Sequence, residues 1–150
     1  MSVAGDIVNN VSSKIGDLLG STFTEMPDLF NLENLSTRNL SNGYGVTMLN
    51  GGEGEVKIIG DVVIHRTLQI RISYRTFSAI DGAKSKTVLQ TLYDNEELIL
   101  NLILKFPQRP TGLLNILDGT TVAVEPFGDG DDNFLINTIT FNCVYHNQIT

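Results

Sequence analysis

Three oxygen-bearing side chains alternate near the end of the sequence, at Asp129, Asp131 and Asn133. This alternation opens the calcium-binding loop of EF-hand proteins. The rest of that loop is missing, because its sixth position is Phe134 where Gly is required and its twelfth is Thr140 where Glu is required. We therefore interpret the stretch as a solvated hairpin loop made of good turn residues, with a weak cation site as the alternative.

Thiol and histidine chemistry has few candidates. Cys143 is the only cysteine, and the two histidines are His65 and His146. Residues three apart on a strand point to opposite faces, so Cys143 and His146 could not easily share a metal. We expect no metal site and no intrachain disulfide, and we expect Cys143 to be a small core residue.

The sequence has no serine-hydrolase elbow and no Walker loop, and its glycine-rich stretch at 51–54 lacks a following helix. That stretch also holds carboxylates where phosphates would bind. We therefore predict that the protein is not an enzyme and holds no cofactor. The acidic turns are instead expected to be exposed or to contact a protein partner. The candidate contact residues are Gly51, Gly52, Glu53, Gly54, Glu55, Asp129, Asp131 and Asp132.

The charge balance is acidic: 10 Lys and Arg residues stand against 17 Asp and Glu, a formal net charge of −7. Proteins that grip nucleic acid by its phosphates need clustered cations, so this balance argues against that function. The nearest approach to a cluster is Arg66, Arg71, Arg75, Lys84 and Lys86. We favour ion pairing for these cations, within the chain or across a subunit contact; a patch for a nucleic-acid backbone is the alternative.

No apolar stretch is long enough to span a bilayer, and residues 1–6 lack the basic start and apolar run of a secretory signal. We therefore expect no membrane association and place the protein in a cytoplasm. The length suits one domain, covering 1–150.

Apolar spacing predicts an α+β fold, with two helices packed on a mostly antiparallel sheet in the order α-β-β-α-β-β-β. The expected elements are a helix at 6–19, a long irregular arm or loop at 21–43, strands at 44–49 and 62–75, a helix at 86–105 capped by Ser85 with a kink or break at Asp94-Asn95, and strands at 113–117, 121–125 and 134–146. Asp118-Gly119 is expected to join two of these strands as a hairpin. Apolar residues scattered through the arm suggest that it lies on something, and a neighbouring subunit is a good candidate.

This layout resembles the tail terminator family of long-tailed bacteriophages. The matching features are the N-terminal amphipathic helix, the irregular arm, the long strand Asp61–Arg75, a helix from Lys84, and a closing meander that ends with the segment Phe134–Tyr145. The resemblance covers most of the chain and is one of layout, since no short motif in it is diagnostic.

The resemblance implies a virion structural protein, assembled in the host cytoplasm, whose subunits close into a hexameric ring. Such a ring caps the tail tube protein, stops its polymerisation, and gives the head–tail connector a docking surface while double-stranded DNA passes through. Six copies at −7 have a formal charge of −42, which would repel DNA from a bore lined by enough of it. The alternatives are another phage neck or tail protein (a connector or tube subunit), a small metal-dependent enzyme, and a cytoplasmic binding module.

Overall fold

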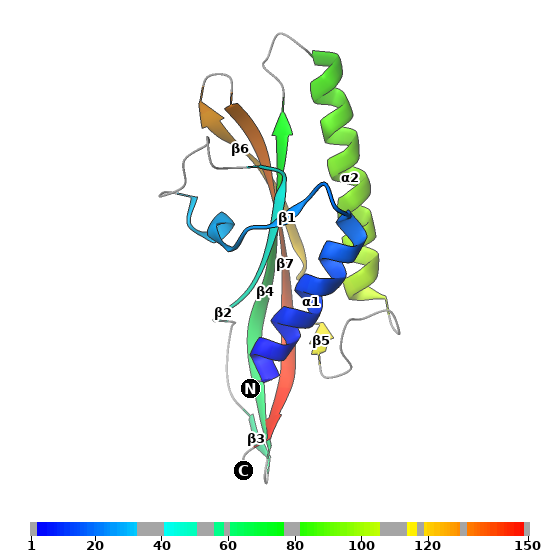
Figure 1. Cartoon of the computed structure of the whole chain (residues 1–150). Helices are drawn as coiled ribbons and strands as arrows, with labels where there is room; N and C mark the ends of the chain where they lie inside the picture. Colours follow the sequence, from blue (N-terminus) through cyan, green and yellow to red (C-terminus); the bar gives the residue numbers. More distant parts are fainter. Residues whose placement is uncertain are drawn as a thin grey trace.

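The computed structural model describes residues 3–32, 41–50, 56–58, 61–76, 82–105, 114–116, 119–129 and 132–148. Within these ranges the fold is α+β: two helices lie on one face of a mostly antiparallel sheet (Figure 1). The helices are α1 (Val3–Leu19) and α2 (Gly82–Leu104), and a short 3-10 helix, η1, spans Pro27–Phe30. The strands are β1 (Thr24–Glu25), β2 (Gly43–Asn50), β3 (Val56–Ile58), β4 (Asp61–Thr76), β5 (Leu114–Ile116), β6 (Thr121–Asp129) and β7 (Asp132–Gln148).

The sheet is built around two long central strands, β4 and β7. They pair antiparallel over their whole lengths, from Asp61 opposite Gln148 to Thr76 opposite Asn133. β2 pairs with the far edge of β4, and β1 adds a short parallel strand beyond β2. On the other side of the sheet, both β5 and β6 pair with β7. The predicted fold class is therefore confirmed.

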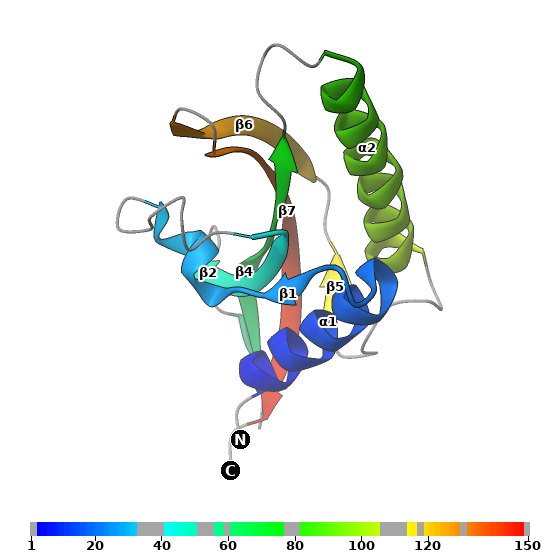
Figure 2. The same cartoon turned by 45° about the horizontal axis from the view of Figure 1, so that its top comes forward.

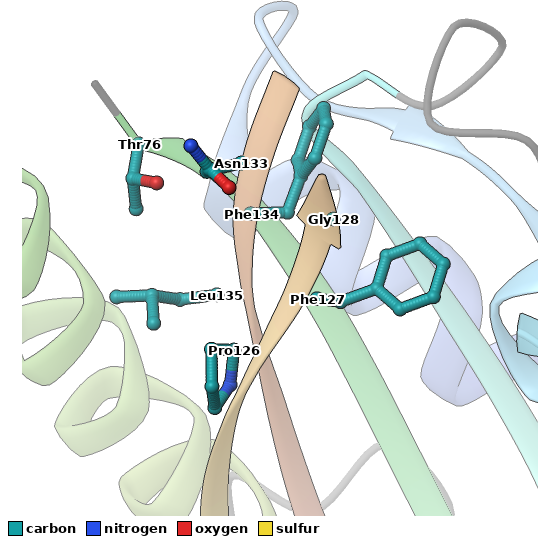
Figure 3. Close-up of a pocket in the computed structure, with 7 residues that line it drawn as sticks. All are labelled: Thr76, Pro126, Phe127, Gly128, Asn133, Phe134 and Leu135. Carbon is teal, nitrogen blue, oxygen red and sulfur yellow. The ribbon is translucent and has the colours of Figure 1, made fainter. Parts of the chain in front are cut away.

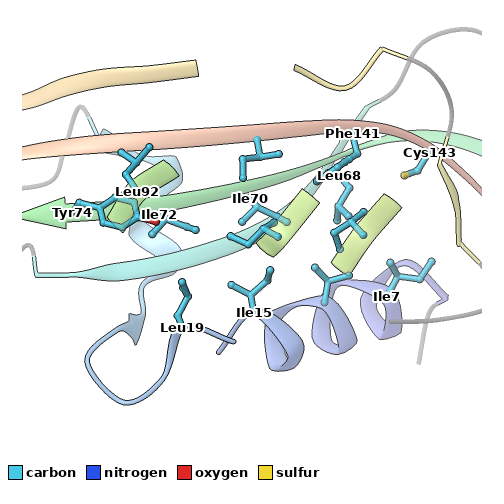
Figure 4. Packing of buried hydrophobic residues seen from close by; sticks show 14 of the residues in the cluster. Ile7, Ile15, Leu19, Leu68, Ile70, Ile72, Tyr74, Leu92, Phe141 and Cys143 are labelled. Atoms are coloured by element: carbon cyan, nitrogen blue, oxygen red, sulfur yellow. The ribbon is translucent and has the colours of Figure 1, made fainter. Parts of the chain in front are cut away.

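The main core lies between the helices and one face of the sheet (Figure 4). Its sequence signal is simple, because α1 buries residues at helical spacing and the central strands bury every second residue. The helix residues are Ile7, Val11, Ile15 and Leu19 from α1, with Leu92, Ile99 and Ile103 from α2. The strand residues are Leu68, Ile70, Ile72 and Tyr74 from β4, with Ile139, Phe141, Cys143 and Tyr145 from β7.

The described part of the arm packs on its own chain. Leu29 of η1 is fully buried against Phe134 and Ile136, on the face of the sheet opposite the helices. Arg71 Nη1 donates a hydrogen bond to the Leu29 carbonyl at 2.9 Å, and its guanidinium lies 5.3 Å from the centre of the Phe30 ring. Residues 24–32 therefore have intrachain contacts, and the neighbouring subunit named as a candidate to cover the arm is not required to bury Leu29. The segment 33–40 lies outside the described residues.

The predicted hairpin at Asp118-Gly119 is wrong. β5 and β6 do not pair with each other; they follow one another along the same edge of β7, with Ile116 opposite Cys143 and Thr121 opposite Thr140. Gly119 has a positive φ of 100°, a conformation that favours glycine, and its carbonyl accepts a hydrogen bond from Asn142. The turn signal thus marks a break in one edge of the sheet.

The hairpin loop expected between the strands at 121–125 and 134–146 is shorter than predicted. β6 continues to Asp129 and β7 begins at Asp132, so these two residues pair across a tight hairpin. Helix α2 likewise begins at Gly82, upstream of the predicted cap at Ser85, and runs through Asp94-Asn95 without a break. In each case the regular element extends past residues that locally favour a turn, because tertiary packing overrides weak propensity.

Candidate functional site

Strand β6 contains the longest run of exposed residues among the described strands. Residues 121–126 are all exposed, whichever face of the strand their side chains occupy. Val122 and Val124 belong to the helix side of the sheet, yet they are 40% and 38% exposed. The two views show β6 curving away from α2, whose contacts with the sheet are mainly with β4 (Figure 2). A long edge strand with exposed apolar residues is a template for pairing with another chain.

The position of Pro126 shows which backbone groups of β6 point away from β7. Pro126 lies opposite Leu135 and has no N–H to donate. In an antiparallel pair, hydrogen-bonded and non-hydrogen-bonded positions alternate, so a proline fits where its N–H would point outward. Val122 and Val124 are alternate residues of β6 in the same series as Pro126, so their N–H and C=O groups point the same way. Their backbone groups therefore face the open edge, where no described residue pairs with them.

Helix α2 also carries exposed apolar residues. Asn95 donates a hydrogen bond to Tyr74 of β4 at 3.3 Å, whereas Glu96 accepts one from Asn137 of β7 at 3.3 Å. Helical geometry places Tyr93 and Leu104 further around α2, in the direction that leads from Asn95 to Glu96. Their side chains are 55% and 40% exposed. These apolar side chains therefore lie on the Glu96 side of α2, outside its buried stripe. Exposed apolar area of this kind marks an interaction surface.

A pocket of about 430 Å³ lies at the hairpin end of β6 and β7 (Figure 3). Its lining residues are Thr76, Pro126, Phe127, Gly128, Asn133, Phe134 and Leu135. None of them is an acid, base or nucleophile suited to catalysis at neutral pH. The pocket therefore offers shape and apolar contact rather than a reaction centre.

Of the contact residues proposed from the sequence, only Asp129 and Asp132 lie in the part of the chain that the structure describes. Residues 51–55, which include Glu53 and Glu55, and Asp131 lie outside the described residues. Asp129 and Asp132 are placed by the backbone register at the tip of the hairpin. The described residues contain no group of three or more His, Cys, Asp or Glu side chains that could hold a metal ion. The assignment of these turns as partner contacts remains a prediction.

Cys143 is confirmed as a core residue. It is 1% exposed, and its thiol donates a hydrogen bond to the Arg66 carbonyl at 3.4 Å. Burial raises the pKa of Cys143 to about 11, against an ordinary value of 9.0, so the reactive thiolate is scarce at neutral pH. His65 pairs with Val144 on the next strand and belongs to the opposite face, so it cannot act as a base for this thiol.

The three arginines in the described part of the chain make intrachain contacts. Arg66 Nε donates to the Tyr145 hydroxyl at 3.4 Å, Arg71 binds η1, and the Arg75 guanidinium lies 5.0 Å from the centre of the Phe134 ring. Arg66 is an even-numbered and Arg71 an odd-numbered residue of β4, so their side chains lie on opposite faces of the sheet. The arrangement does not gather them into a stripe for a nucleic-acid backbone.

No protein-family model matches the chain, and no curated protein sequence matches it. None of the described helices is long and apolar enough to cross a membrane.

The sequence did not lead us to predict the exposed surface of β6, although one signal for it was present. Pro126 follows an alternating run, and a proline within such a run indicates an edge strand.

Proposed function

We propose that this protein is a structural subunit of a phage particle, a tail terminator whose copies form a ring that caps the tail tube and receives the head connector. The observation that supports this most is β6, a nine-residue edge strand whose residues 121–126 are exposed on both faces. Such a strand is stabilised by a second chain, and an assembly subunit is the class of protein that supplies one.

The other properties of the site fit an assembly function. The described residues contain no group of three or more His, Cys, Asp or Glu side chains that could hold a metal ion, and the pocket at the hairpin end is lined by no acidic or basic side chain. The acidic net charge would keep a ring from adhering to the DNA that passes through it. The resemblance in layout to tail terminators supplies the particular role, which is to end tube growth by closing over the last tube ring.

The experiment is to produce particles without this protein and to examine the tails by electron microscopy. We expect tails of uncontrolled length that lack heads, and we expect the intact protein supplied from a plasmid to restore both length and joining. Tails of normal length that still fail to join heads would instead indicate a connector, which is the second candidate. Tails of normal length with heads attached would contradict both assignments.

A further inference from the structure

The sheet has a second open edge, at β2. β1 covers only the start of β2, where Thr24 pairs with Gly43 and Glu25 with Tyr44. Beyond this point no described residue pairs with residues 46–50 on the side away from β4. Leu49 in this stretch is 45% exposed. The described sheet therefore ends in an unpaired strand on both sides.

The backbone groups at the β2 edge can be assigned as they were for β6. The carbonyls of Asn42 and Tyr44 accept hydrogen bonds from Thr24 and Met26, at 3.1 and 2.7 Å. Even-numbered residues of β2 therefore turn their backbone groups away from β4, and by the same parity Val46 and Met48 present theirs at the open edge. Each edge thus offers two alternate residues whose backbone groups point outward. They are Val46 and Met48 on β2, and Val122 and Val124 on β6.

The two edges run in opposite directions. β2, β4, β7 and β6 are adjacent in that order, and every neighbouring pair among them is antiparallel. Across four such strands, the first and the last are antiparallel to each other. A rotation about an axis along the strands preserves strand direction, so it would bring β6 of one copy antiparallel to β2 of the next. Repeating that rotation closes a ring of head-to-tail contacts.

We infer that copies of this chain join edge to edge, with β6 of one subunit adding as a strand to β2 of the next. This inference rests on the ring in the proposed function and identifies the contact that closes it. The contact is short at both ends, because β1 covers β2 up to Tyr44 and Pro126 has no N–H to continue a ladder. On the helix side, Val122 and Val124 would be covered by Val46, Met48 and the neighbouring helix α1, which packs on β2.

A cysteine pair tests this contact directly. In an antiparallel pair the non-hydrogen-bonded positions bring side chains closest, and here these are the odd residues, Ala123 on β6 with Thr47 or Leu49 on β2. One tagged chain carries A123C and a second carries T47C or L49C, and both are produced in cells that assemble the whole particle. The native protein, whose Cys143 is buried, is the control. We expect a mixed disulfide between A123C and one of the β2 variants after mild oxidation, and no disulfide when either variant is produced alone.

A backbone variant provides the second measurement. V124P removes one outward N–H while leaving the ladder to β7 untouched, and V124T is the matched control that keeps the N–H. We expect V124P to fold and melt like V124T but to enter the ring roughly tenfold less well, because one edge carbonyl loses its donor. If both variants enter the ring equally and no mixed disulfide forms, the inference is overturned. A disulfide formed by A123C alone would also overturn it, since that indicates a two-fold dimer of β6 edges.

The two hypotheses fail in different ways. Mixed disulfides together with normal tails in the absence of the protein would support the edge contact and contradict the terminator function. Overgrown tails in the absence of the protein, with no mixed disulfide, would contradict the edge contact alone.

Discussion

Val124 lies directly opposite Asn137 in the ladder between β6 and β7, and the two residues have opposite environments. The Asn137 side chain is fully buried and hydrogen-bonded to Glu96, whereas Val124 is 38% exposed. On the helix side the main core therefore ends at β7, and residues 121–126 of β6 lie beyond it. An apolar residue outside the core and a polar residue inside it are the reverse of what burial energy alone would select.

This contrast predicts two different effects on stability. V124T should change the free energy of unfolding by less than about 0.5 kcal/mol, as for an ordinary surface substitution. N137A should lower it by roughly 1–3 kcal/mol, because it leaves Glu96 without its partner and removes a buried side chain. Urea unfolding of the isolated subunit measures both values. A cost for V124T as large as that for N137A would show that β6 belongs to the subunit core.

The contact between Arg71 and η1 predicts the behaviour of the arm. R71K should destabilise the fold by roughly 1–2 kcal/mol, because an ammonium cannot reproduce both the hydrogen bond to Leu29 and the planar contact with Phe30. Amide hydrogen exchange over residues 24–32 should accelerate more than exchange in α1. R75K is the control, since the Arg75 side chain is exposed and a lysine keeps a cation above Phe134. Equal effects of the two substitutions would contradict a specific role for Arg71.

Two buried groups predict a loss of stability at alkaline pH. Burial raises the pKa of Cys143 from 9.0 to about 11 and that of Tyr74 from 10.0 to about 12. The unfolded chain therefore loses these protons first, so the stabilisation is complete below pH 9 and is lost as the pH rises through 11 and 12. C143A should give a shallower decline in the free energy of unfolding between pH 9 and 11 than the native protein. Parallel curves for the two proteins would contradict this assignment.

The acidic hairpin tip predicts tolerance to charge removal. Asp129 and Asp132 are paired in the backbone register at the end of the hairpin, where no core residue is placed. Replacing Asp129, Asp131 and Asp132 together with Asn should leave the free energy of unfolding within about 0.5 kcal/mol of the native value. Calcium or magnesium should not raise the melting temperature of the native protein. A loss of several kcal/mol in the variant, or a rise in melting temperature with either cation, would favour a cation site.

The elements with sustained periodicity could be predicted from the sequence, and those set by pairing partners could not. The alternation in β4 and the helical stripe of α1 each report burial on one face, which is a local property of the chain. Whether β5 and β6 form a hairpin depends on a strand that is distant in the sequence, because both of them pair with the same edge of β7. The exposure of Val122 and Val124 likewise depends on where α2 lies across the sheet. Neither placement is encoded in the residues nearby.

We propose that copies of this chain form a closed ring that ends the tail tube. Electron cryomicroscopy of the intact particle, reconstructed without imposed symmetry, tests it most directly. We predict one closed ring of this chain at the junction of tube and head, with six copies related by rotation. A single copy, a two-fold dimer, or a ring repeated along the length of the tube would contradict the proposal.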